Sequence, residues 1–178
     1  MELPRQYRWL LDEPGPRILT VALRTYGTQE GPGNTNNPEI MRWAREVGLE
    51  RIYMSDSTAW CGLWMAYVAG EAGWDYAPRG NALWARNWLF WGNPSEVQML
   101  GDVLVFERSA GGHVGLYVGE DPEAFHVLGG NQSDKVMIKR ISKGRFLGSR
   151  RCPWRISRPD NVRRVHLAAS GSLSTNEA

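Results

Sequence analysis

The sequence predicts an α+β domain in which N-terminal helices pack on an antiparallel β-sheet. Up to Gly92, apolar residues recur at helical spacing, whereas short β-type runs separated by turn residues follow it. At 178 residues the chain is long enough for one hydrophobic core. We therefore expect a single domain over residues 1–156 and a polar, flexible tail over residues 157–178.

Two helices are expected in the first quarter of the chain. Residues 18–26 carry apolar side chains at helical spacing, and the loop GTQEGPGNTNN follows them. Asn37 is suited to cap a second helix that has Pro38 at its first position and stops near Gly48. This region therefore supplies two of the predicted helices.

A third helix is expected after Ser57 or Thr58, either of which is a plausible N-cap, and should end within residues 70–73. Its first turn contains Cys61, one of only two cysteines in the chain. The other is Cys152, and we expect both to be reduced.

Tryptophan is unusually abundant, with nine residues in the chain. A fourth helix starting at Asn81 would bring Trp84, Trp88 and Trp91 onto one face at i, i+4 and i+7. Such a stripe either fills a core or lines a groove in which a sugar or peptide stacks. The spacing leaves both interpretations open.

Five segments after Gly92 read as strands: 103–106, 113–118, 124–128, 136–141 and one that begins at 146–147. Gly, Asp, Pro and Ser clusters separate them. Consecutive short strands with tight connections predict an antiparallel meander.

Cys61 is a candidate nucleophile because of its expected place in the first turn of a helix. Free backbone N–H groups and the helix dipole favour a thiolate there and are suited to bind the oxyanion of acyl transfer. The ordinary alternative is a buried, inert cysteine in an apolar run.

A partner for this thiol is His113, which follows two glycines at the start of a predicted strand. If residues 121–124 form the next turn, paired residue numbers sum to about 245. His113 then lies opposite Gln132 and one step from Asn131, whereas His126 pairs some six residues away as an ordinary strand residue. Cys61, His113 and Asn131 are the parts of a Cys-His-Asn site.

Several motifs carry a family resemblance: WCGLWMAYV (60–68), GDVLVF (101–106), GHVGLYVGED (112–121) and VLGGNQSDKVMI (127–138). Through them the chain resembles papain-like cell-wall hydrolases of the NlpC and CHAP type over residues 18–142. The segments NNPEIMRW and GNALWARNW are similar to a phage-associated and bacterial subgroup. The position where NlpC-type enzymes often have a second histidine falls near Leu128, so the CHAP-like amide pattern fits better.

The resemblance implies a papain-like core with a groove between the nucleophile helix and the sheet. It implies hydrolysis of peptidoglycan amide bonds by a thiol endopeptidase or an N-acetylmuramoyl-L-alanine amidase. Cys61 is then the nucleophile, His113 the base and Asn131 the residue that orients the base. Further candidates belong to the oxyanion hole or the groove (Trp60, Gly62, Gln132) or are groove aromatics (Trp84, Trp88). Gly62 is expected to keep the groove open.

Composition argues against several other functions. A net charge of +2 without a basic stripe does not suggest nucleic-acid binding. The chain shows no nucleotide-binding glycine motif, zinc-ligand spacing or apolar run long enough to span a membrane, so no cofactor, metal or integral membrane segment is expected. The basic stretch RRCPWRISRP (150–159) is either a solvated tail or a contact for an anionic wall or membrane surface.

Peptidoglycan is the expected partner. The N-terminus shows no export signal, so we expect synthesis in the cytoplasm and release or delivery to the cell wall by phage lysis, a virion or a secretion machine. The alternative function is a catalytically silent, peptidoglycan-binding or structural tail module with the same fold. Acyl transfer to an acceptor other than water uses the same site.

Overall fold

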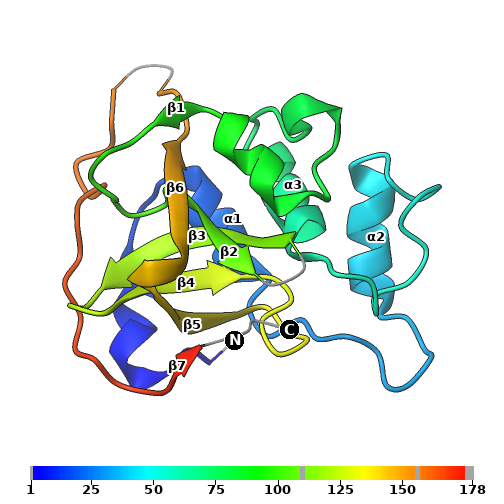
Figure 1. Cartoon of the computed structure of the whole chain (residues 1–178), viewed down its shortest axis with the longest axis horizontal. Coiled ribbons are helices and arrows are strands. Elements are labelled where there is room, and N and C mark those ends of the chain that lie inside the picture. Colours follow the sequence, from blue (N-terminus) through cyan, green and yellow to red (C-terminus); the bar gives the residue numbers. More distant parts are fainter. Residues whose placement is uncertain (1, 109–110, 155–156, 175–178) are drawn as a thin grey trace.

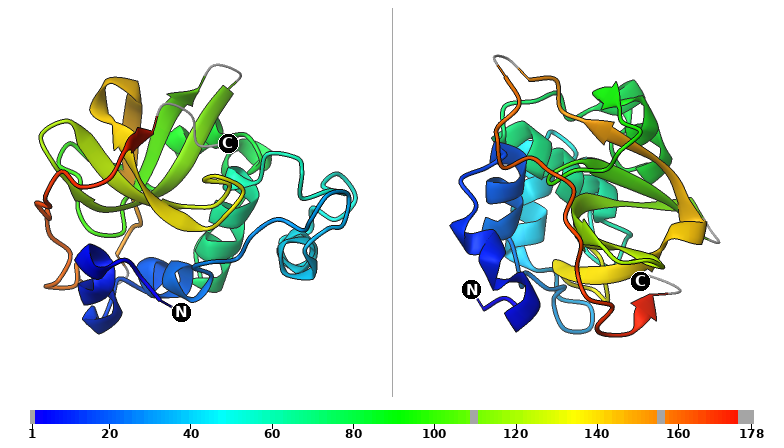
Figure 2. Two further views of the ribbon diagram at one scale, coloured as in Figure 1. Left: turned by 90° about the horizontal axis from the view of Figure 1, so that it is seen from below. Right: turned by 90° about the vertical axis from the view of Figure 1, so that its left-hand side faces the viewer.

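The computed structural model describes residues 2–108, 111–154 and 157–174. A seven-stranded sheet forms one layer, and the N-terminal helices cover one of its faces (Figure 1). The predicted α+β class with a mostly antiparallel sheet is confirmed. Figure 2 shows the helices gathered on one side of the sheet and the C-terminal segment running along its outer side.

The described α-helices and 3₁₀-helices are η1 (Arg5–Asp12), α1 (Arg17–Arg24), α2 (Pro38–Glu46), α3 (Cys61–Glu71), η2 (Pro78–Gly80), η3 (Ala85–Phe90) and η4 (Lys143–Arg145). The predictions for the first two α-helices are confirmed. Asn37 caps α2 as expected, because its side-chain oxygen accepts a hydrogen bond from the Glu39 amide at 2.7 Å.

The described strands are β1 (Asn93–Pro94), β2 (Val103–Arg108), β3 (Gly111–Glu120), β4 (Ala124–Gly129), β5 (Met137–Ser142), β6 (Phe146–Arg151) and β7 (Leu173–Ser174). Their order in the sheet is β1-β6-β2-β3-β4-β5-β7, and only the β5–β7 pairing is parallel among those described. The predicted meander is confirmed for β2 to β5, whereas the last predicted strand, β6, pairs with β2 instead of β5. The long strand β3 lies at the centre of the sheet.

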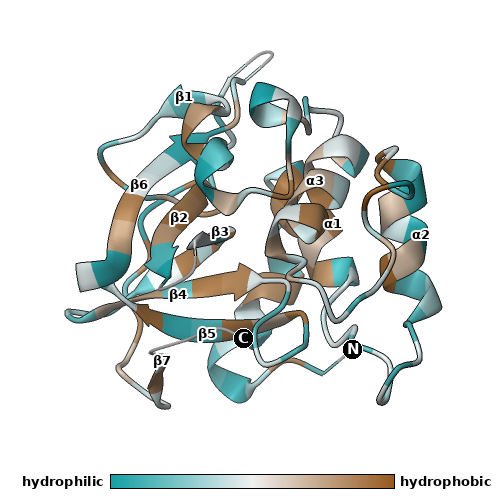
Figure 3. Ribbon diagram, turned by 45° about the vertical axis from the view of Figure 1, so that its right-hand side comes forward, coloured by the Kyte–Doolittle hydropathy of each residue, from teal (hydrophilic) through white to brown (hydrophobic). Residues whose placement is uncertain are grey.

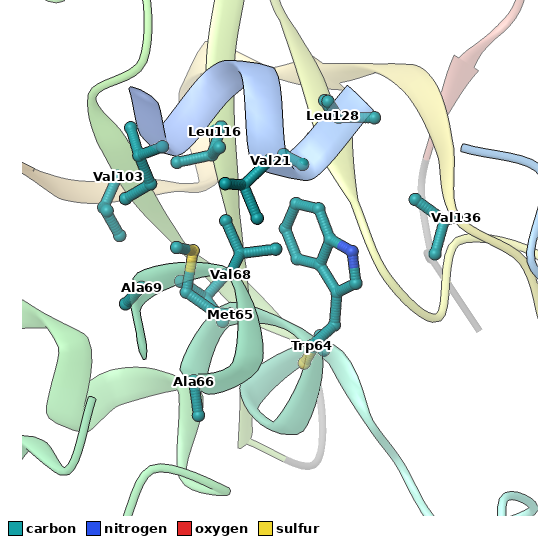
Figure 4. Packing of buried hydrophobic residues seen from close by; sticks show 14 of the residues in the cluster. Val21, Trp64, Met65, Ala66, Val68, Ala69, Val103, Leu116, Leu128 and Val136 are labelled. Carbon is teal, nitrogen blue, oxygen red and sulfur yellow. The ribbon is translucent and has the colours of Figure 1, made fainter. Parts of the chain in front are cut away.

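Helix α3 is the centre of the hydrophobic core. Eight of its eleven residues are buried, because α1 and α2 pack on it from one side and the sheet from the other. Trp64 and Val68 point from α3 toward α1, with Val103 and Leu116 of the sheet close by (Figure 4). Hydrophobic residues gather on α3, whereas α2 presents hydrophilic residues to the outside (Figure 3). An apolar α3 fixes Cys61, its first residue, against the sheet.

Residues 81–91 do not form the α-helix that the tryptophan spacing predicts. The chain makes the short 3₁₀-helix η3, with Trp84 61% exposed and Trp88 and Trp91 buried. Trp88 donates from Nε1 to the Ala82 carbonyl at 3.0 Å, which fixes its ring inside the core. The expected stripe is therefore divided between core and surface.

Residues 157–174, predicted as a polar tail, contact the rest of the molecule at several points. Val162 is buried, and the Glu120 amide donates to the Val165 carbonyl at 2.8 Å. Strand β7 then adds to the edge of the sheet. The last predicted tail residues, 175–178, lie outside the described residues, as do residues 155 and 156 of the basic stretch.

Ion pairs fasten this C-terminal segment. Arg163 contacts Glu13 at 2.8 Å, and Arg164 contacts Glu120, which also binds Lys143 at 2.6 Å. Arg163 and Arg164, and Arg151 of the basic stretch, which contacts Asp102 at 2.7 Å, thus neutralise carboxylates of the protein itself. In the part of the chain that the structure describes, no helix is sufficiently long and apolar to cross a bilayer.

Candidate functional site

Cys61 is the first residue of α3, and Trp60 is the N-cap. The predicted caps Ser57 and Thr58 lie in the turn before the helix instead. Trp60 makes no side-chain cap hydrogen bond, so the first-turn amides of α3 remain directed at the space next to the cysteine. The predicted location of the cysteine at a helix N-terminus is therefore confirmed.

The sulfur of Cys61 lies against strand β3. Burial raises the pKa of the thiol and outweighs hydrogen bonds from the backbone amides of Val114, Gly62 and Cys61 and the charge of Arg108, all of which lower it. The expectation of a thiolate favoured by the helix N-terminus is wrong in sign for this arrangement. Desolvation is the larger effect, and the resting group is a neutral thiol.

His113 is adjacent to this contact, because it precedes Val114 on β3. Pairing between β3 and β4 begins at Leu116 and Leu128, so β4 does not cover the edge of β3 at Val114. The edge amide of Val114 is thereby open to the sulfur. The structure thus brings Cys61 to the residue next to the predicted base.

Gln132 fixes the imidazole of His113. Its Oε1 lies 3.1 Å from His113 Nε2, while its own Nε2 donates to the carbonyls of Val127 and Met137. Because both amide hydrogens are committed to carbonyls, the amide oxygen must face the ring. An amide oxygen only accepts, so His113 Nε2 carries the proton and Nδ1 carries the basic lone pair.

Asn131, which the sequence assigns to this role, does not make that contact. It adopts a left-handed conformation with φ 54°, and its buried Oδ1 has no hydrogen-bond partner among the described residues. The predicted register holds near the turn, where His126 pairs with Gly119, but a bulge between Tyr117 and Gly119 shifts the pairing by one residue on the side of His113. Gln132, expected in the oxyanion hole or groove, makes the contact with the imidazole that the sequence assigns to Asn131.

Trp60 and Gly62 also differ from expectation. The Trp60 ring is fully buried, packs on Trp43 and donates to Glu30 Oε1 at 2.7 Å, so it belongs to the core rather than to a groove. A Cβ at Gly62 would lie 2.3 Å from the Ala82 carbonyl oxygen. Gly62 thus permits a close backbone approach and does not keep a groove open.

Of the two predicted groove aromatics, Trp88 is a core residue and Trp84 is exposed. Trp84 directly follows Leu83, whose carbonyl oxygen would lie 2.6 Å from a Cβ at Gly62. The exposed indole of Trp84 is therefore next in sequence to Ala82 and Leu83, which cross the start of α3.

The candidate site is closed in this conformation. Cys61 is 3% exposed and His113 is fully buried, so the expected open crevice is not formed. A cavity of about 530 Å³ lies elsewhere, between η1, β5 and the C-terminal segment. The chemistry of the thiol and the imidazole therefore depends on how substrate reaches them.

His126 belongs to a second buried polar group that the sequence did not predict. Its Nδ1 lies 2.6 Å from the Tyr7 hydroxyl and its Nε2 lies 2.9 Å from Asp121, which also binds Arg140 at 2.7 Å. Burial lowers the pKa of His126. This network ties η1 to β4 and β5, which explains why this histidine serves the fold.

Among the described residues, no cluster of three or more His, Cys, Asp or Glu side chains is arranged to hold a metal ion. A comparison with protein-family models and a search of curated proteins find no match to this chain. The site is therefore interpreted from its own geometry.

Proposed function

We propose that the protein is a cysteine hydrolase with a papain-like core of the NlpC and CHAP type. The observation that carries the proposal is the hydrogen bond that His113 Nε2–H donates to Gln132 Oε1, which selects the tautomer with a basic Nδ1 on the residue next to Val114, where the Cys61 sulfur lies. A base of fixed tautomer next to a thiol is the arrangement that nucleophilic acyl transfer requires.

The proposed reaction begins with proton transfer from the Cys61 thiol to His113 Nδ1 as sulfur attacks the carbonyl carbon of an amide. The amides of Cys61 and Gly62 at the start of α3 stabilise the oxyanion. His113 then returns the proton to the leaving amine, and the C–N bond breaks to give a thioester. Water, deprotonated by His113, hydrolyses the thioester and restores the thiol.

The raised pKa of Cys61 sets the timing of this proton transfer. The thiol is neutral at rest, and the thiolate forms only as the carbonyl arrives. His113 therefore acts as a general base during the attack, and a thiolate–imidazolium ion pair is not present before substrate binds.

Asn131 has a different role in this proposal. Its buried Oδ1 lacks a hydrogen-bond partner among the described residues, and such an acceptor is costly to leave unsatisfied. A substrate N–H next to the scissile carbonyl is a donor of the right kind. We therefore assign Asn131 to substrate binding, beside the residue that positions His113.

The proposed substrate is peptidoglycan, cleaved between stem-peptide residues or between the sugar and the stem. The motifs around Cys61, His113 and Gln132 support this class. Trp84, exposed next to the start of α3, offers a face on which a sugar or peptide can stack. Delivery by phage lysis, a virion or a secretion machine belongs to the same proposal.

One observation favours the alternative of a non-catalytic wall-binding module. Cys61 is almost completely buried and its pKa is raised, as in an inert core cysteine. The two functions differ in whether the thiol is needed for any change in the substrate.

The deciding experiment is digestion of purified sacculi followed by mass spectrometry of the released muropeptides. We expect the wild type and Cys152→Ala to release the same new products, and Cys61→Ala to release none while keeping its thermal unfolding midpoint. Sacculus binding without products in all three proteins would establish the module instead. Products from Cys61→Ala would contradict the hydrolase.

A further inference from the structure

We propose that residues 81–91, here named the strap, close the Cys61–His113 site and must be displaced to admit substrate. The inference concerns access to the thiol. It rests on the proposed function only in naming the substrate as what enters.

The strap crosses both members of the pair at the residues that flank them. Gly62 follows Cys61, and a Cβ on it would lie 2.3 Å from the Ala82 carbonyl oxygen. Gly112 precedes His113, and a Cβ on it would lie 3.0 Å from Arg86 Cγ and 3.3 Å from Ala85 Cβ. Two glycines therefore allow one segment to lie directly on the start of α3 and on the start of β3.

A single side chain fastens the strap to the sheet at this point. Arg86 Nε donates to the Gly111 carbonyl at 2.9 Å, and its guanidinium lies 3.5 Å from the Glu107 carboxylate. Both partners in the ion pair are largely exposed to solvent, so water competes with these contacts. This polar attachment is therefore weaker than the buried contact that holds Trp88.

The other half of the strap is held firmly. Trp88 is fully buried, and its contact with the Ala82 carbonyl keeps the strap in one shape. Left-handed backbone conformations bound the segment, with φ 50° at Arg79, φ 71° at Gly80 and φ 49° at Gly92. These are element-terminal positions of the kind at which a segment pivots. Trp88 thus holds the strap in the core, whereas Arg86 holds it to the edge of the sheet.

The first test measures alkylation of Cys61 by iodoacetamide, read peptide by peptide by mass spectrometry. Arg86→Ala removes the contacts of the strap with Gly111 and Glu107. We expect Cys61 to be modified about tenfold faster, because one charge-assisted hydrogen bond no longer holds the closed form. Cys152, a buried thiol outside the site, reports global unfolding and should keep its rate.

Arg145→Ala is the matched control. Arg145 donates from Nε to the Glu107 carbonyl at 2.9 Å, so it contacts the residue that Arg86 pairs with but is not part of the strap. We expect wild-type alkylation of Cys61 in this variant. Equal rates in the Arg86 and Arg145 variants, or a parallel rise at Cys61 and Cys152, would overturn the proposal.

The second test locks the strap. In Ala85→Cys/Gly112→Cys the two β-carbons would start 3.3 Å apart, slightly closer than a disulfide prefers, and the flexible Arg86 side chain can move aside. Oxidation should slow alkylation of Cys61 at least tenfold relative to the same protein reduced beforehand. If oxidised and reduced forms react at Cys61 equally fast, the strap does not control access.

The two proposals fail separately. Alkylation reports on the thiol without any substrate. If the strap controls alkylation of Cys61 but the protein releases no muropeptides, the proposed hydrolase activity is contradicted and the control of access is supported. If the protein releases Cys61-dependent products, but neither Arg86→Ala nor the disulfide changes the alkylation rate of Cys61, the control of access is contradicted and the hydrolase activity is supported.

Discussion

A glutamine side chain holds the imidazole of the candidate site by using all its polar atoms. Its two amide hydrogens bind Val127 and Met137, and its oxygen binds His113. A group fixed at three points has little rotational freedom, so the ring it binds has little freedom as well. Gln132 is therefore a positioning residue that acts through His113.

We predict that Gln132→Ala lowers kcat by about 100-fold because His113 loses its fixed tautomer. Gln132→Glu keeps an acceptor for Nε2–H and should retain more activity. Its carboxylate favours the imidazolium and should move the acidic limb of the pH–rate profile upward. Asn131→Ala is the comparison and should raise KM more than it lowers kcat.

A structural readout accompanies the kinetics. Nitrogen NMR of His113 should show a proton on Nε2 in the wild type and a mixture of tautomers in Gln132→Ala. A wild-type ring protonated on Nδ1 would remove the role assigned to Gln132, whatever the rates.

At this scale the sequence predicts Cys61 and His113 but not the third residue. The register predicted from the sequence places residue 132 opposite His113 and Asn131 one step away, and Asn131 is assigned as the third residue of a Cys-His-Asn site. The bulge between Tyr117 and Gly119, which shifts this register, is not predicted. The left-handed backbone of Asn131 and the paired carbonyls that bind Gln132 are tertiary features. Local sequence does not encode which of two adjacent amides they direct at the ring.

Among the elements, α3 and the strap depend on a close contact of backbone with backbone. The Ala82 and Leu83 carbonyls occupy the space where a side chain at position 62 would begin. The second residue of α3 is thus constrained by a segment some twenty residues later in the chain.

We predict that Gly62→Ala destabilises the fold by about 1–3 kcal/mol, measured by urea unfolding, because backbone atoms cannot yield as a flexible side chain does. Gly70→Ala is a control in the same helix. A Cβ there meets Tyr76 Cδ1 at 3.2 Å, and the better helix propensity of alanine offsets this contact. Equal stabilities of the two variants would contradict the packing described for Gly62.

The elements divide into those that local pattern predicts and those that it does not. The strands and the first two helices follow their apolar periodicity and caps. Residues 81–91 do not, because Trp88 and Trp91 are fixed by burial while Trp84 turns outward. The spacing of the three tryptophans, i, i+4 and i+7, would also suit an α-helix. Only the packing around them selects the 3₁₀-helix.

In the whole molecule, charge fixes the C-terminal segment to the sheet. Glu120, at the end of β3, binds Arg164 of that segment and Lys143 of η4. Burial alone would raise its pKa, but hydrogen bonds from Arg164 and Lys143 prevail and hold the pKa at about 2, against an ordinary value of 4.5.

This pKa shift predicts acid sensitivity. A carboxylate with a depressed folded pKa stabilises the fold above pH 4.5 and loses that contribution as pH falls from 4.5 toward about 2. Glu120→Gln should be less stable at neutral pH and should lose less stability on acidification, as read from urea midpoints across this range. Glu123→Gln, at an exposed carboxylate in the same turn, should follow the wild type. A wild-type pH dependence in Glu120→Gln would contradict the assignment.

The order of apolar patterns along the chain predicts the α+β class, whereas the contacts of the C-terminal segment could not be predicted in this way. Residues 157–174 are polar and small, which is typical of a flexible tail. Their order comes from specific pairs such as Arg163 with Glu13 and Arg164 with Glu120. Pairings between charges far apart in sequence leave no periodic signal.

The contact of Glu13 with Arg163 and Asn161 also dictates an order of events during synthesis. Glu13 is synthesised 150 residues before Arg163. The contact between these segments therefore forms only after residue 163 has left the ribosome, and an arrest of translation before codon 161 would leave Glu13 without both partners.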